Sequence, residues 1–147
     1  AVEWIRKGGL FPEEVTVKQE KTYGNSRFDI YVESEQRKAF VEVKGVTLED
    51  HNIARFPDAP TERGVKHVEE LIRCMKDGYE AYLLFVIQMK GITLFEPNWN
   101  THPAFGEVLQ RAQKAGVNLI ARDCLVTEDT IEIQDPVEIY IMERNHA

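Results

Sequence analysis

The chain of 147 residues has the length of one ordinary domain and can build a sizeable hydrophobic core. It has no apolar run near the roughly 20 residues that a membrane span requires, and its two cysteines, Cys74 and Cys124, lack metal-ligand spacing. These features predict a cytoplasmic protein with reduced thiols and no membrane segment. The net charge of −7 argues against a protein that binds duplex DNA through an overall excess of basic residues. Any contact with nucleic acid therefore needs a local basic cluster.

The first third of the chain predicts a short helix and three meandering strands. Residues 1–8 have the pattern of an amphipathic helix, and residues 15–23 are strand-like. Two further strands are expected over 27–32 and 39–46, and the polar segment 34–37 between them has the length of a hairpin loop. We therefore expect these neighbouring strands to pair antiparallel.

Two longer helices follow, each with signals at both ends. Thr61 is the expected N-cap of a helix over 62–77, and Gly78 ends that helix. Pro103 opens the second helix and Gly116 ends it. Both carry an apolar stripe at helical spacing, so each is expected to cover one face of a sheet.

Apolar runs between and after these helices predict the remaining strands. Residues 81–87 and 117–121 have the unbroken apolar character of central strands, and short strands are expected near 130–134 and 137–142. The order favours a single α/β domain with a mixed central β-sheet flanked by helices. The sheet is expected to be antiparallel at the start and parallel across the later helical crossovers.

The strand over 39–46 carries an unusual charge pattern. Alternation places Glu42 and Lys44 on one face, with their apolar neighbours on the other. A buried strand does not gain stability from a charge pair unless something compensates it. A metal ion and a phosphate are the compensation that we expect.

The hairpin register sharpens this expectation. A four-residue loop places Asp29 opposite Glu42, and Arg27 opposite Lys44. Two carboxylates with Cβ atoms about 5 Å apart repel each other, and a divalent cation between them reverses the sign of that interaction. The alternative is a solvated sheet face on which like charges merely coincide.

The helix that begins near residue 62 carries basic side chains opposite its apolar stripe. Arg63, Lys66 and His67 project from this side in the first half of the helix, where the helix dipole also favours anions. They are candidates for phosphate contacts. The alternative is an ordinary solvated helix face, which the interspersed glutamates indicate.

These residues resemble two nested groups of proteins. An aspartate on one strand and Glu-x-Lys on the next resemble the PD-(D/E)xK nuclease superfamily, which includes restriction endonucleases and Holliday-junction resolvases. Within that superfamily, three segments of this chain resemble the sugar fermentation stimulation protein A (SfsA) family. They are residues 23–29 (YGNSRFD), 41–48 (VEVKGVTL) and 55–67 (RFPDAPTERGVKH). The literal Pro-Asp of the superfamily name is not kept, because Asp29 follows Phe28.

The resemblance implies a restriction-endonuclease-like (PD-(D/E)xK) core and a DNA-binding protein linked to the regulation of sugar (maltose) metabolism. It also implies that residues 1–147 form a single nuclease-like domain. In that expectation the domain is the C-terminal portion of a longer chain, whose N-terminal OB-like domain is absent from this sequence.

The first functional hypothesis is metal-dependent phosphodiester hydrolysis. Asp29, Glu42 and the backbone carbonyl of Val43 would hold Mg²⁺ or Mn²⁺ as an oxygen-ligand site. Lys44 would orient the attacking water and stabilise the phosphate charge, which makes Asp29, Glu42 and Lys44 the expected catalytic residues. Glu3, on the first helix, is a candidate outer ligand, and the alternative, which is favoured, is an ordinary solvent-exposed helix residue.

Nucleic acid, with DNA favoured over RNA, is the expected partner. Its contacts are assigned to Ser26, Arg27, Arg63, Lys66 and His67. The alternative function is a non-catalytic, non-specific DNA-binding regulatory factor. The tail strands expected at 130–142 either pack on the same domain or form the interface of a homodimer.

Overall fold

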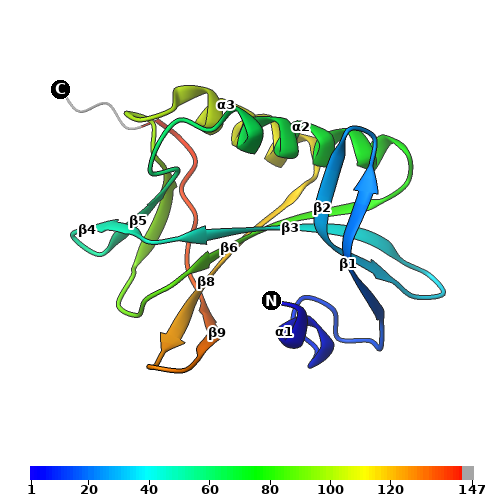
Figure 1. Ribbon diagram of the computed structural model, residues 1–147. Helices are drawn as coiled ribbons and strands as arrows, with labels where there is room; N and C mark the ends of the chain where they lie inside the picture. The colour runs from blue at the N-terminus through cyan, green and yellow to red at the C-terminus, as the bar shows by residue number, and fades with distance from the viewer. Residues whose placement is uncertain (144–147) are drawn as a thin grey trace.

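The computed structural model describes residues 1–143 and shows a mixed α/β domain (Figure 1). Its elements are α1 (Val2–Arg6), β1 (Thr16–Tyr23), β2 (Ser26–Glu33), β3 (Lys38–Val46), β4 (Leu48–Asp50), β5 (Ile53–Phe56), α2 (Glu62–Lys76), β6 (Glu80–Ile87), β7 (Leu94–Pro97), α3 (Pro103–Ala115), β8 (Asn118–Val126) and β9 (Ile131–Pro136). Within this part of the chain no helix is long and apolar enough to cross a membrane.

The main sheet has six strands in the order β1-β2-β3-β6-β8-β9. Strands β1 to β3 pair antiparallel, and β3, β6 and β8 are parallel to one another. The last strand, β9, returns antiparallel to β8. The predicted mixed sheet is therefore confirmed, including the change from antiparallel to parallel pairing at β3.

Helices cover both faces of this sheet. Figure 1 shows α2 and α3 side by side over one face and α1 on the other side. The buried side chains form two clusters that match these layers. One joins the α2 and α3 face to Phe40 and Phe85, and the other joins Ile5 of α1 to Val41 and Leu84.

The helix ends behave as the sequence predicts. Thr61 Oγ1 accepts a hydrogen bond from the backbone N–H of Gly64 at 2.9 Å and caps α2. Gly78 and Gly116 follow the two long helices with φ angles of 92° and 103°, the left-handed conformation that glycine adopts without steric cost.

A second, three-stranded sheet in the order β4-β5-β7 was not predicted. Strand β4 is exposed along its whole length, so it has no apolar alternation to reveal it. The turn that joins β4 to β5 uses positive φ at His51 and Asn52 instead of glycine. The strand expected at 137–142 is wrong: Ile139 forms only an isolated bridge with Phe95, while β9 confirms the strand near 130–134.

Candidate metal and phosphate site

The site lies where the β2–β3 hairpin stops being a regular ladder. The predicted register holds from Glu33↔Lys38 to Ile30↔Val41 and then ends, so the expected pairs at Asp29 and Arg27 are absent from the ladder. The partner strand β1 is also irregular here, because Glu20 lies between the pairs Gln19↔Ile30 and Lys21↔Phe28 with a φ of 55°. The register of β1 and β2 is the same on both sides of Glu20, so this is a local gap in the pairing and not a bulge.

Two carboxylates replace the missing ladder bonds. The backbone N–H of Asp29 donates to Glu42 Oε1 at 3.2 Å, and the backbone N–H of Val43 donates to Asp29 Oδ2 at 2.8 Å. Each acid is thereby fixed by the other strand. Asp29 and Glu42 are consequently neighbours across the hairpin. They are joined by backbone-to-side-chain hydrogen bonds and not by the ladder pair that the sequence predicts.

Glu42 also takes part in a compact polar cluster on the α2 side of the sheet. Its side chain is only 2% exposed, and its Oε2 lies 3.2 Å from Lys44 Nζ and 2.6 Å from His67 Nδ1. Lys44 Nζ and His67 Nδ1 are 3.1 Å apart. The cluster joins β3 to α2 at its buried surface.

Burial and neighbouring charges perturb two groups of this cluster. Burial, with a further contribution from Asp29, raises the pKa of Glu42 to about 7 against the opposing effect of Lys44. Burial, Lys44 and Arg63 lower the pKa of His67. These shifts favour an uncharged imidazole near neutral pH, and they favour the protonated form of Glu42 more than in an ordinary carboxyl group.

His67 lies deeper than its sequence position on the polar face suggested. It is 8% exposed and shares the buried side of α2 with Gly64, Val68 and Leu71. The spacing of these four positions, i, i+3, i+4 and i+7, is the apolar-stripe pattern. A histidine inside that stripe was the sequence signal for a buried polar contact.

The donors present suit a hard divalent cation. Within residues 1–143 no group of three or more His, Cys, Asp or Glu side chains can hold a metal, so Asp29, Glu42, a backbone carbonyl and water are the ligands available. Burial raises the pKa of Glu42, and a bound cation would favour its charged form. Oxygen donors of this kind are those that Mg²⁺ uses.

A hollow of about 460 Å³ lies beside this cluster, between the β1–β2 turn and the first half of α2. Figure 1 shows the β1–β2 hairpin rising next to α2, and Lys66 Nζ lies 3.4 Å from the carbonyl oxygen of Asn25 across it. The structure brings together the five residues assigned to nucleic-acid contacts: all line this hollow, namely Ser26, Arg27, Arg63, Lys66 and His67.

Glu3 is not brought to the site. Ile5 of the same helix packs with Ile30, Val41 and Leu84, whereas alternation along β3 points Glu42 to the opposite face. Glu3 instead lies 3.6 Å from Arg6 on the surface. The expectation of an outer ligand from α1 fails because α1 covers the wrong side of the sheet.

The fold and the site define the class: a mixed α/β domain with paired carboxylates and a lysine on its central sheet. Comparison with known proteins agrees with this description. Residues 1–130 match a family model described as "Sugar fermentation stimulation protein RE domain". The chain therefore belongs to the sugar fermentation stimulation protein (SfsA) family.

Individual relatives are similar over most of this chain. A sugar fermentation stimulation protein homolog of Clostridium beijerinckii is 57% identical over 139 residues, which cover 95% of this chain and 62% of that protein. A homolog of Desulfitobacterium hafniense is 57% identical over 141 residues, covering 96% and 61%. This chain thus spans about three fifths of their length.

A solved structure of SfsA from Pyrococcus furiosus in complex with Ca²⁺ has the same fold. It is 29% identical to this chain and superposes with a TM-score of 0.83, covering 95% of this chain and 62% of the other.

Proposed function

We propose that this domain is a metal-dependent phosphodiesterase that acts on nucleic acid, with a restriction-endonuclease-like (PD-(D/E)xK) core. The observation that carries the proposal is the pair of carboxylates, Asp29 and Glu42, each held by a backbone N–H of the opposing strand next to Lys44. The two acids replace ladder hydrogen bonds, but that structural role does not offset the repulsion between neighbouring carboxylates, which a bound cation would relieve. The Ca²⁺ in the P. furiosus structure supports a cation in this family.

Each residue has a defined role in this proposal. Asp29, Glu42 and the carbonyl of Val43 hold Mg²⁺ or Mn²⁺, which when bound supplies Lewis-acid stabilisation of a phosphoryl oxygen and a more acidic water. Lys44 donates hydrogen bonds to the phosphate and orients the attacking water. His67 positions this pair through Nδ1, which when uncharged donates to the Glu42 carboxylate in one tautomer and accepts from Lys44 in the other.

The decisive experiment measures cleavage of single- and double-stranded DNA and RNA with Mg²⁺ or Mn²⁺. Asp29→Asn and Lys44→Met are expected to lower cleavage by about a hundredfold or more, the size of effect seen when one transition-state contact is removed. Glu3→Gln is the matched control, because it removes one carboxylate from an exposed position on the other face. Cleavage that survives unchanged in both site variants would refute the proposal.

A second candidate is a non-catalytic DNA-binding regulatory factor. The basic hollow favours it, because Arg27, Arg63 and Lys66 provide a binding surface that needs no turnover. This function predicts DNA binding with a steep salt dependence, insensitivity to EDTA and no strand scission. Metal-dependent scission by the purified domain decides against it.

A further inference from the structure

Two exposed arginines beside the centre have no ion-pair partner among the described residues. Neither Arg27 nor Arg63 has a hydrogen bond or ion pair to any residue among 1–143. Acidic residues outnumber basic ones by 25 to 18, so carboxylate partners are abundant. The other arginines of the described chain do find partners: Arg6 with Glu3, Arg37 with Glu80, Arg55 with Glu96, Arg73 with Glu70, Arg111 with Glu69 and Arg122 with the carbonyl of Gln134.

A buried hydroxyl lines the same hollow. Ser26 is 4% exposed, and its Oγ has no hydrogen-bond partner within residues 1–143. An unsatisfied buried hydroxyl destabilises a fold. A bound ligand that accepts a hydrogen bond from the Ser26 hydroxyl would remove this loss of stability.

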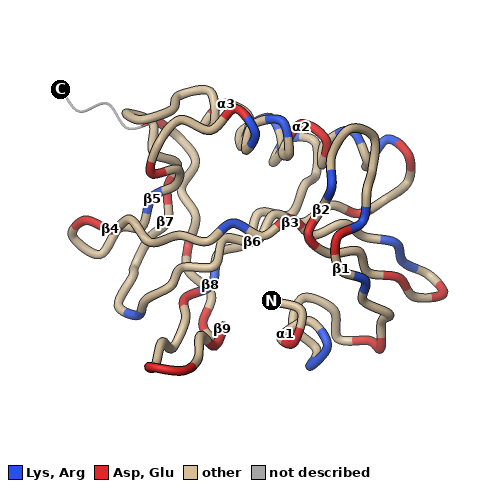
Figure 2. The backbone as a smooth tube through the Cα atoms, in the orientation of Figure 1, with Lys and Arg blue, Asp and Glu red and all other residues tan. Residues whose placement is uncertain are grey.

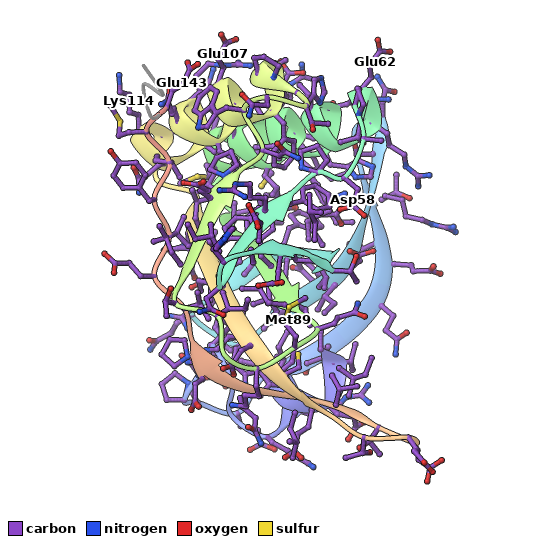
Figure 3. The ribbon with its side chains drawn as sticks, turned by 90° about the vertical axis from the view of Figure 1, so that its left-hand side faces the viewer. Asp58, Glu62, Met89, Glu107, Lys114 and Glu143 are labelled. Carbon is purple, nitrogen blue, oxygen red and sulfur yellow. The ribbon has the colours of Figure 1, made fainter. Side chains whose placement is uncertain are left out.

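The charges around the hollow favour an anion. Arg27 comes from β2, while Arg63 and Lys66 come from α2, and Glu62 is the one acid that lines the hollow. Figure 3 shows the Glu62 side chain pointing away from the sheet at the start of α2. Figure 2 shows the Lys and Arg segments of α2 in a chain that is otherwise rich in acidic segments.

The hollow and the carboxylate centre share one residue. His67 lines the hollow and also contacts Glu42 Oε2 through Nδ1. The hollow is therefore directly adjacent to the carboxylate centre.

We propose that this hollow is a phosphate subsite, in which Ser26, Arg27, Arg63 and Lys66 bind the phosphate adjacent to the one at the carboxylate centre. The inference rests on the proposed function, because it places the scissile phosphodiester at Asp29 and Glu42. The subsite fixes which bond of the strand lies at the centre. Guanidinium groups and a hydroxyl are suitable donors for phosphate oxygens.

The test measures binding of a short fluorescent single-stranded DNA in EDTA over a series of salt concentrations. Arg27→Gln and Arg63→Gln are each expected to weaken binding severalfold and to reduce the slope of log K against log salt by roughly 0.7 per lost phosphate contact. Arg111→Gln is the matched control, since it removes the same charge from an exposed pair with Glu69. Identical slopes and affinities for the three variants would overturn the subsite.

Ser26→Ala separates a built pocket from a general positive field. Its melting temperature should not fall, because no protein hydrogen bond is lost, while its affinity for the DNA and for competing inorganic phosphate should fall. Unchanged affinity would overturn the pocket. DNA strands that carry a hydroxyl or a phosphate at either end show which phosphate occupies the hollow. Tighter binding of a strand with one phosphorylated end supports a terminal phosphate in the hollow. Equal binding of all these strands supports an internal phosphate.

This test is independent of turnover, because it is run without divalent metal. Arginine-dependent binding without metal-dependent cleavage would refute the proposed hydrolysis and leave the subsite standing. Cleavage with no effect of Arg27→Gln or Arg63→Gln on binding would refute the subsite alone.

Discussion

Replacing the buried acid at the centre should change how stability depends on pH. In metal-free protein the pKa of Glu42 is raised from 4.5 to about 7. Between these values the folded protein holds a proton that the unfolded chain has released. The contribution of Glu42 to stability is therefore fully present below pH 4.5 and is lost as the pH rises through about 7. The shift corresponds to roughly 3 kcal/mol, at 1.36 kcal/mol for each unit.

Glu42→Gln keeps the shape of the side chain and removes its charge at every pH. In EDTA this variant should be more stable than the wild type at pH 8, by up to about 3 kcal/mol, and close to it at pH 4.5. His67 contributes with the opposite sign, because its lowered pKa makes stability fall as the pH drops below its ordinary value of 6.5. The difference between the two proteins, and not either slope alone, isolates Glu42.

Urea unfolding followed by circular dichroism at several pH values from 5 to 8 measures this difference. An offset that stays the same at pH 5 and pH 8 would refute the reasoning, because it would show that Glu42 does not titrate in this window. Mg²⁺ provides a second check. It should stabilise the wild type at pH 8, by about 2.7 kcal/mol at a hundredfold excess over the dissociation constant, and should stabilise Glu42→Gln less.

Three further changes test other parts of the structure. Lys44→Met should raise the pKa of both Glu42 and His67, because Lys44 lowers both pKa values. NMR titration measures the two pKa values. In the control variant, Lys66→Met, the pKa of His67 should rise while the pKa of Glu42 stays nearly unchanged. Thr61→Ala should cost about 1 kcal/mol, since it removes the cap of α2, and denaturant unfolding that shows no loss would contradict that contribution. Phe85→Ala should cost about 3 to 5 kcal/mol, because Phe85 is fully buried and its ring lies 4.3 Å from that of Phe95 on the second sheet; a loss below about 1 kcal/mol would show that this contact does not hold the sheets together.

The sequence predicted the parts of the fold that depend on local signals. Caps and apolar stripes located α2 and α3, and the alternation and loop length of the β2–β3 hairpin brought Asp29 to Glu42. The second sheet escaped prediction because β4 and β7 are short and are stabilised by pairing with β5, which is a tertiary contact.

The details of the site depended on tertiary packing in the same way. Alternation could not show that the β2–β3 ladder ends at Ile30, next to the point where β1 is irregular at Glu20. The position of His67 depends on how α2 is rotated on the sheet. The five residues of the basic hollow were predicted individually, but their convergence follows from the packing of the β1–β2 turn against α2.

The proposed function and the proposed subsite together predict that the two parts of the site respond differently to a divalent cation. At the centre, Asp29 and Glu42 repel a phosphate until a cation is bound, and the net charge of −7 adds to this repulsion. The hollow has the opposite sign, because three basic side chains and one acid line it. Chelation should therefore abolish cleavage while leaving much of the binding intact. A strand held at Arg27, Arg63 and Lys66 would lie beside the centre before the cation arrives, so affinity would depend mainly on salt and cleavage mainly on metal.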